Sequence, residues 1–596
     1  MIPFLQKINA FLKKEWHFPH AEKLNGTIDS FTLTEKLVFY FFFFVMCGAG
    51  LFILAKVNDA VSVEVKIRGG SLTEGIVDTP RFINPLLAIS DADRDLAALT
   101  YSGLMRTTTT GDLVPDLAKS YSVSGDGLTY DFVLRDSLTF QDGTPLTADD
   151  VIFTIQKAQD SDLKSPKRAN WQGVTAEKVS NSEVRLTLKK AYSPFLSNAT
   201  LGILPKHIWG NVESGQFAFS DFNVQPVGSG PYEVSNVQRA SSGSPLLYDL
   251  TPFDHYAGDK PYISKLTFRF FSSDSDLFDA RNNGTVESVS AVSPDKLADL
   301  RNADGRIETA PSSRIFGVFF NQNQAPVFAY KEVRQALDMA LDKQDIVNQV
   351  LHGYGKVING PVPPGSFAGA TSEQLSAAGT STDRIAEAKA LLEKSGWAIN
   401  PTTGIYEKKV SKKQTIALAF SLTTSAAAEL KSAAEIAKAR WEKLGAKVDI
   451  KVFELGDLNQ NVIRPRSYDA LLFGEIVGRD LDLFAFWHSS QRLDPGLNIA
   501  LYTNAKADKL LETARVTEDQ ATRDDIYRQF EASISDDTPA IFLYSPDFIY
   551  VVPRKIRGFS IGQVTVSSER FADVVHWYAE TEKVWRIFAG DQALSQ

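Results

Sequence analysis

Cysteine is almost missing from this chain of 596 residues, which contains only Cys47. A single thiol cannot form an internal disulfide, and it cannot supply the paired cysteines of a zinc site or a CxxC redox motif. Cys47 does not match a lipoprotein acceptor either, because Phe44, Val45 and Met46 precede it where small residues are needed. We therefore expect a fold stabilised by core burial, with Cys47 as an ordinary residue of an apolar segment.

An excess of positive charge is also missing. Lys and Arg together number 63 against 72 Asp and Glu, which gives a formal net charge of −9. This balance provides no basic surface for a phosphate backbone, so we expect no nucleic-acid partner. With 43% hydrophobic and 23% charged residues, the chain is too apolar to be disordered and long enough for two or more packed lobes.

The common catalytic motifs are missing as well: there is no His-Glu-x-x-His, no phosphate-binding Gly-x-x-x-x-Gly-Lys-Ser/Thr loop, no Gly-x-Gly-x-x-Gly and no Gly-x-Ser-x-Gly. Among seven scattered histidines, only His17 and His20 are spaced as a metal pair. Asp274, Asp276 and Asp279 have the wrong spacing for an EF-hand, and we interpret them as the solvated start of a helix. We expect no catalysis, no cofactor and no bound metal.

One long apolar run is present. Residues 37–55 carry no charge, and as a helix they would span about 28 Å at about 1.5 Å per residue, close to a bilayer core of about 30 Å. More lysines precede this run than follow it closely, which favours a cytoplasmic segment 1–36 and an extracytoplasmic remainder of the chain. The alternative is a cleaved secretory signal, but the run starts late, is long, and no convincing cleavage site follows it.

The most informative stretch of the sequence lies between residues 127 and 155. Residues 128–134 alternate as a half-buried strand does, and Asp142-Gly143 supplies a turn. Thr147 and Asp150 have the spacing of a capping box, which opens a helix. The stretch therefore predicts a strand, a turn and a capped helix.

The same residues resemble a sequence block of the extracytoplasmic solute-binding proteins of peptide ABC transporters, known as family 5. Further blocks resemble this family and keep its order along the chain: residues 69–75, 83–86, 101–106, 114–121, 228–232, 320–321, 333–337, 342–346, 487–491 and 496–498. Each block is short, but their common order makes the resemblance specific.

This resemblance implies an α/β fold, a two-lobed periplasmic-binding-protein-like clamp with an inserted subdomain, here preceded by one N-terminal transmembrane helix. Transferred by block position, lobe I comprises residues 62–105, 190–312 and 546–596, the inserted subdomain 106–189, and lobe II 313–545. The chain would cross between the lobes near 312–317 and 542–546.

Apolar periodicity in 313–545 agrees with an α/β lobe. It predicts helices over 332–341, from Asp342 to near Gly353, around 385–392, and over 426–444 with Gly445 at the end. Strands are predicted over 415–422, 448–452 and 468–474. The strand, helix and strand from 415 to 452 indicate a right-handed crossover between parallel strands.

A polar loop with aromatic residues follows the strand predicted over 468–474, and ligands of open α/β sheets bind beyond such strand ends. In peptide-binding family members this region meets the peptide amino terminus. The resemblance therefore implies Asp480, Asp482 or Glu475 as partner of the ammonium group. Leu481 and Leu483 stand where the family has prolines, and Glu475 where many members have tryptophan, so the choice stays open.

Ordinary loop charges are the alternative for these three carboxylates. Trp487 is predicted either as a ligand contact or as a core residue. Proximity to family blocks adds weaker ligand-binding candidates, which are Asn84, Phe320, Asn321, Asn498, Tyr502 and Tyr544.

We predict a membrane-anchored, extracytoplasmic solute-binding protein that captures oligopeptides between two lobes and delivers them to the permease of an ABC transporter. It would act as a monomer without enzymatic activity. One alternative is a cell-surface receptor or sensor with the same fold, uncoupled from transport. Another is a binding protein for a different solute, namely a nickel chelate, haem or an oligosaccharide.

Overall fold

The computed structural model describes residues 27–28, 30–300, 305–366 and 381–589. His17, His20 and most of the predicted cytoplasmic segment lie outside the described residues. The chain divides into two units, Met1–Ile67 with Thr581–Gln596 and Arg68–Glu580, and each is described by itself.

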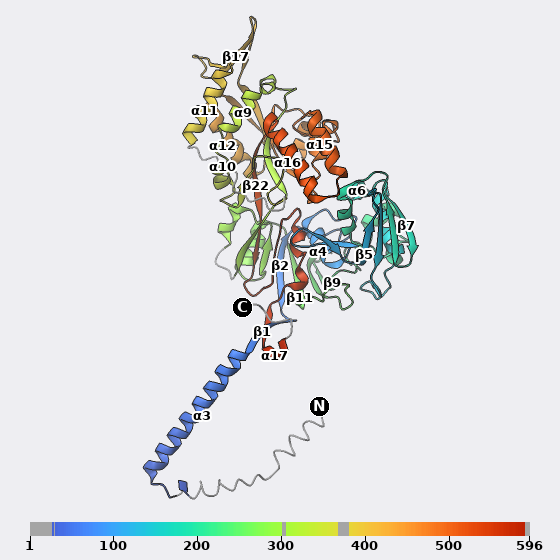
Figure 1. Cartoon of the computed structure of the whole chain (residues 1–596), viewed down its shortest axis with the longest axis vertical. Helices are drawn as coiled ribbons and strands as arrows, with labels where there is room; N and C mark the ends of the chain where they lie inside the picture. The colour runs from blue at the N-terminus through green and yellow to red at the C-terminus, as the bar shows by residue number, and fades with distance from the viewer. Residues whose placement is uncertain (1–26, 29, 301–304, 367–380, 590–596) are drawn as a thin grey trace. The chain divides into compact units, whose positions relative to one another are not determined.

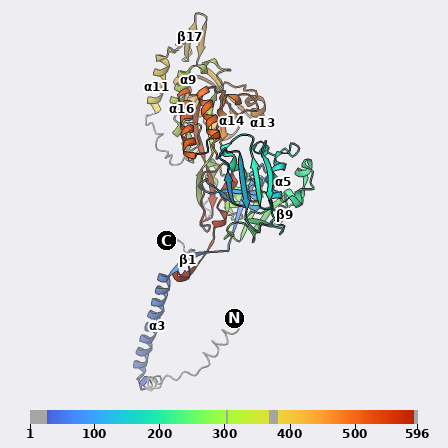
Figure 2. The same ribbon diagram turned by 45° about the vertical axis from the view of Figure 1, so that its right-hand side comes forward.

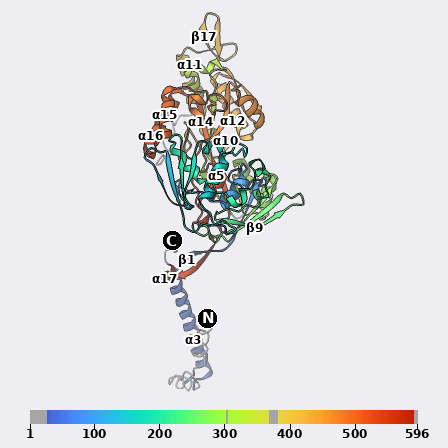
Figure 3. The ribbon, with the colours of Figure 1, turned by 90° about the vertical axis from the view of Figure 1, so that its right-hand side faces the viewer.

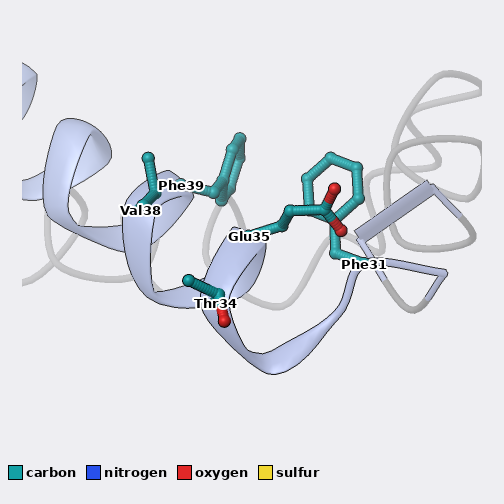
Figure 4. A pocket seen from close by; sticks show the side chains of 5 residues that line it. All are labelled: Phe31, Thr34, Glu35, Val38 and Phe39. Carbon is teal, nitrogen blue, oxygen red and sulfur yellow. The ribbon is translucent and has the colours of Figure 1, made fainter.

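The first unit contains the predicted membrane helix as α3, Leu33–Val61. Thr32 opens it through a capping box with Glu35, in which the Thr32 N–H donates to the Glu35 carboxylate at 2.8 Å. No residue of α3 is buried, and the helix is long and apolar enough to cross a membrane. Figure 4 shows its first turns, where the ring of Phe31 lies 6.0 Å from that of Phe39 beside a shallow hollow.

Both lobes of the second unit share one 12-stranded sheet in the order β20-β19-β21-β14-β22-β12-β2-β11-β10-β9, with β13 and β15 also paired to β22. Its strands are β2 (Ser71–Val77), β9 (Tyr232–Arg239), β10 (Pro245–Pro252), β11 (Lys265–Phe271), β12 (Ser288–Ser290), β13 (Arg306–Pro311), β14 (Arg314–Phe320), β15 (Gly355–Val357), β19 (Ala419–Ser425), β20 (Lys447–Phe453), β21 (Ala470–Ile476) and β22 (Ala540–Val552).

Strand β22 runs through both lobes, as Figure 1 shows. Its first half pairs with β14 up to Tyr544, and its second half pairs with β13 from Asp547. β13 and β14 are themselves separated at Ser312 and Ser313. The chain thus passes between the two cores at two neighbouring places. The lobe boundaries given above stay predictions.

Lobe I surrounds a core to which β2, β9, β10 and β11 contribute with α4 (Asp91–Thr100). A separate four-stranded sheet, β5-β6-β8-β7, packs into the same core; its strands are β5 (Ala118–Val123), β6 (Thr129–Leu134), β7 (Thr175–Ser180) and β8 (Glu183–Thr187). In Figure 2 this sheet lies beside α5 (Ala148–Gln159). The predicted strand and capped helix are confirmed, since Thr147 and Asp150 form the capping box of α5.

Lobe II is a three-layer α/β structure. One face of its sheet packs against α9 (Lys331–Met339), α10 (Lys343–Val350), α11 (Ser381–Lys394) and α12 (Ala428–Leu444), and the other against α15 (Ala505–Val516) and α16 (Gln520–Asp537). The predicted helices are confirmed, and β19, α12 and β20 form the predicted crossover with parallel strands. The hairpin of β17 (Tyr406–Ser411) lies at one end of the lobe in Figure 1 and Figure 3.

Two strand predictions were wrong in detail. The single strand over 415–422 is two strands, β18 (Gln414–Ala417) and β19, because β18 pairs with β17 while β19 enters the large sheet. The strand over 468–474 extends to Ile476, so Glu475 lies inside β21 rather than in the loop after it. Glu475 pairs across the sheet with Ile315 of β14.

Candidate functional site

The polar loop that follows β21 lies between the two lobes. We call residues 477–483 the interlobe loop. Its first residue, Val477, donates its N–H to the carbonyl of Ser313 at 3.0 Å, which holds the loop against the crossing between β13 and β14. Three side chains of the loop, Arg479, Asp480 and Asp482, each contact residues of lobe I.

Asp482 forms an ion pair with Arg515 of α15. The Arg515 Nη2 donates to Oδ2 of Asp482 at 2.6 Å, and Nε lies 3.0 Å from both carboxylate oxygens. Tyr192 of lobe I donates its hydroxyl to the same carboxylate at 3.1 Å. Burial alone would lower the pKa of Arg515, but the Asp482 carboxylate raises it. The charge of Asp482 is therefore already compensated within the protein.

Asp480 has a different environment, although it stands only two residues away. It accepts a hydrogen bond from the hydroxyl of Ser197, in the 3₁₀ helix Ser193–Thr200 of lobe I. Burial raises the pKa of the Asp480 carboxyl, and the Ser197 hydroxyl and the charges of Arg523 and Arg479 act in the opposite direction. Asp480 is thus partly buried, and no residue that the structure describes forms a bidentate ion pair with it.

Two arginines complete the contacts between the lobes. Arg479 donates through Nη2 to the Gln563 carbonyl at 2.6 Å and to Glu569 at 2.9 Å. Arg523 of α16 donates to the hydroxyl of Ser193. Figure 1 shows α15 and α16 on the side of lobe II that faces the four-stranded sheet of β5, β6, β8 and β7.

Glu475 is the most unusual carboxylate of the region. It is 4% exposed, and neither carboxylate oxygen has a hydrogen-bond partner within the described parts of the chain. Burial raises the pKa of Glu475 well above its ordinary value. Burial thus disfavours the charged form of Glu475, which is the form that an ammonium partner needs.

Trp487 is a core residue of lobe II. Its ring is fully buried, and it lies 5.7 Å from Phe542, 6.2 Å from Phe319 and 6.3 Å from Tyr502. Asn498 stabilises the surrounding turn by donating to the carbonyls of Trp487 at 3.2 Å and Tyr502 at 3.1 Å. The packing supports the core interpretation of Trp487, and the ligand contacts predicted for these residues stay predictions.

The remaining candidates are also buried. Phe320 packs in the core of lobe II with its ring 4.5 Å from that of Phe328, and Tyr544 stacks on Phe316 at 5.2 Å. Asn321 accepts from the N–H groups of two following residues, and Asn84 accepts from the Leu86 N–H at 2.9 Å. These side chains shape turns and cores, and a role in ligand binding stays a prediction for each.

Sequence reasoning missed the residues that partner the interlobe loop. They are Tyr192, Ser197, Arg515 and Glu569. Tyr192 and Asp482 are 290 residues apart in the chain, so no local pattern links them. The interpretation of Asp274 and Asp276 is confirmed, because both lie in the first turn of α8 (Asp274–Asn282).

A two-lobed α/β structure of this kind is the fold of the solute-binding proteins. The model of the bacterial extracellular solute-binding proteins, family 5, matches residues 112–495, more than half of the chain. The chain therefore belongs to this family, as the sequence blocks predicted, and it is homologous to peptide-binding proteins of ABC transporters.

Among its relatives is the oligopeptide-binding protein AppA of Bacillus subtilis, 29% identical over 499 residues, which cover 83% of this chain and 89% of AppA. The structure of AppA in complex with a nonapeptide is similar with a TM-score of 0.64 and 26% identity, over 86% of this chain and 100% of that one.

Two further solved structures resemble the chain. The substrate-binding protein CtaP of Listeria monocytogenes has a TM-score of 0.71 at 28% identity, over 86% of this chain and 99% of CtaP. NikZ of Campylobacter jejuni, in complex with Ni(L-His), has a TM-score of 0.66 at 26% identity, over 85% of this chain and 99% of NikZ. The predicted fold class is confirmed, and the relatives named here are binding proteins rather than enzymes.

Proposed function

We propose that this protein captures oligopeptides between its two lobes and that Asp480 receives the peptide amino terminus. The observation that carries this proposal is the placement of Asp480. It lies on the interlobe loop, is partly buried, and has among the described residues no bidentate ion pair like the one that Arg515 forms with Asp482. A carboxylate in water-poor surroundings makes a strong charge-assisted hydrogen bond to an ammonium group.

The other two carboxylates suit this role less well. Asp482 already accepts the guanidinium of Arg515, so an added ammonium group would compete with a bidentate partner. Burial raises the pKa of Glu475 and so disfavours the charged form that would attract an ammonium group. When it is protonated, the Glu475 carboxyl could donate a hydrogen bond to a peptide carbonyl near the end of β21.

Closure of the lobes would couple binding to delivery. A peptide that contacts both lobes favours the arrangement in which the interlobe loop meets lobe I, and it shifts the equilibrium only by the difference in its affinity for the two arrangements. The backbone can pass between the cores near Ser312 and near Ser545, where β22 changes its pairing partner.

We further propose that the loaded protein, a monomer without catalytic activity, presents the peptide to the permease of an ABC transporter. In this proposal α3 is a retained single-pass anchor, and lobes I and II lie on the extracytoplasmic side. The capped start of α3 and its direct continuation into β1 (Ser62–Ile67) support a helix that remains attached to the folded protein.

Calorimetry with the detergent-solubilised full chain tests the ligand class. Oligopeptides of different lengths, a nickel–histidine chelate and a maltooligosaccharide are titrated in parallel, because the likeness to NikZ makes the chelate the most informative competitor. Binding of peptides alone supports the proposal. Binding of the chelate alone, or of none of the three, would refute it.

Protease added to intact cells tests the topology. Digestion of the chain beyond residue 60 with protection of residues 1–36 supports the anchored arrangement. Mass analysis of the membrane-extracted protein distinguishes an anchor from a signal peptide, because cleavage would remove the mass of α3.

A further inference from the structure

The C-terminal part of the chain returns to the end of the membrane helix. Strand β23 (Glu580–Trp585) pairs with β1, which directly follows α3. Lys583 donates to Asp59 at 3.1 Å, and the indole N–H of Trp585 donates to the side-chain oxygen of Asn58 at 2.7 Å. Because Asn58 and Asp59 belong to α3, β23 is held against the last turn of the helix.

A small apolar core strengthens this attachment. Val63 and Val65 of β1 and Ala589 of α17 (Arg586–Ala589) are buried together, with Val584 packed against them. The segment from β23 to α17 is therefore folded onto the membrane-proximal end of the chain.

Large apolar side chains of this segment nevertheless remain exposed. Trp585 is 50% exposed, Ile587 78% and Phe588 75%. The rings of Trp585 and Phe588 stack at 6.4 Å with an interplanar angle of 16°. Single exposed apolar residues are common on protein surfaces, but a group of three beside a membrane helix indicates a contact with lipid or protein.

The depth of this group can be derived from α3. The uncharged run ends at Ala55, and Lys56 follows it. Asn58 lies three residues beyond Ala55, which corresponds to about 4.5 Å along a helix at about 1.5 Å per residue. A bilayer with a hydrocarbon core of about 30 Å and a total thickness of about 40–45 Å has headgroup layers of about 5–8 Å on each side. The contact of Trp585 with Asn58 thus lies at headgroup level.

We propose that Trp585, Ile587 and Phe588 form a second membrane contact, in the headgroup region of the outer leaflet beside the end of α3. The inference rests on the proposal that α3 is a retained membrane helix. Trp suits this layer because its ring is apolar while its N–H has a polar partner, here Asn58. Arg586, between Trp585 and Ile587 in the sequence, adds a positive charge that favours anionic headgroups.

Fluorescence quenching in vesicles tests the contact. The full chain carrying Cys47→Ser and Ile587→Cys is labelled with an environment-sensitive fluorophore and reconstituted into phosphatidylethanolamine and phosphatidylglycerol vesicles. We expect a loss of fluorescence when the vesicles contain lipids with a nitroxide near the headgroup, and a smaller loss when the nitroxide lies deep in the acyl chains.

A label at Leu54→Cys in the same background separates this inference from the anchoring itself. Quenching at position 54 without quenching at 587 would overturn the second contact and leave the anchor intact. A label unquenched at both positions would overturn both. Disulfide cross-linking between two copies through position 587, without quenching there, would assign the group to a protein contact and also overturn the inference.

Discussion

Replacing Asp480 by asparagine should weaken the binding of peptides with a free amino terminus. The substitution keeps the shape of the side chain and the hydrogen bond with Ser197, and it removes the negative charge. Once a bound peptide covers Asp480, loss of the charged partner costs about 2–5 kcal/mol, which corresponds to roughly 30-fold to several-thousand-fold in affinity.

Asp482→Asn should behave differently, because the charge of Asp482 is paired with Arg515 rather than with the ligand. We expect a loss of at most about threefold in peptide affinity, or about 0.7 kcal/mol. Asp536→Asn is the matched control for the change in net charge, since Asp536 is 79% exposed and pairs only with Lys331 of lobe II among the described residues. Such an exposed pair contributes at most about 1 kcal/mol.

Calorimetry with two versions of one peptide, free and acetylated at the amino terminus, completes the assay. The acetylated peptide should bind the parent protein weakly and lose little more in Asp480→Asn. If Asp480→Asn stays within about threefold of the parent for the free peptide, the amino terminus does not bind here. If Asp482→Asn shows the large loss instead, the ion pair with Arg515 does not exclude the ligand and the choice between the two carboxylates is wrong.

Burial raises the pKa of the Asp480 carboxyl, whereas an ammonium partner favours its charged form. The affinity for the free peptide should therefore be highest above the pKa of unliganded Asp480 and should fall as the pH decreases through that pKa. Calorimetry across acidic pH should show no such fall in Asp480→Asn. Tyr192→Phe removes the hydrogen bond to Asp482 and should increase hydrogen exchange in residues 477–483, whereas Tyr248→Phe, which loses a bond within lobe I, should leave that segment unchanged. Arg570 of lobe I forms buried ion pairs with Glu74 and Asp95. Arg570→Met leaves these two carboxylates without their cation and should lower the free energy of unfolding by about 3–5 kcal/mol in denaturant titrations. A loss below about 1 kcal/mol would contradict this account.

The elements of lobe II that sequence reasoning predicted best are those whose determinants lie within a few residues. Asp342 accepts from the N–H of Asp345 at the start of α10, and Gly445 ends α12 with a φ of 108°, a conformation that L side chains rarely adopt. Both signals are complete within one helical turn, so the printed sequence contains all the information that the prediction needs.

The end of β21 was not predictable in the same way. The apolar run over 468–474 predicts a strand that stops before Glu475, with the polar loop after it. In the structure β14 continues alongside as far as Arg314, whose pairing partner is Ile476, and this pairing extends β21 past the glutamate. The backbone hydrogen bonds of the neighbouring strand thus decide the boundary, and the side chain is buried although it is polar.

The two carboxylates of the interlobe loop show where sequence reasoning reaches its limit. Asp480 and Asp482 are the same residue type, two positions apart, and the resemblance leaves both as candidates for the partner of the ammonium group. Their difference arises from distant parts of the chain: α15 brings Arg515 to Asp482, and the 3₁₀ helix Ser193–Thr200 brings a hydroxyl to Asp480. The guanidinium of Arg515 compensates the charge of Asp482, whereas the neutral hydroxyl of Ser197 leaves the charge of Asp480 available for a ligand. Tertiary contacts, rather than the sequence of the loop, therefore select Asp480 as the candidate partner of the ligand.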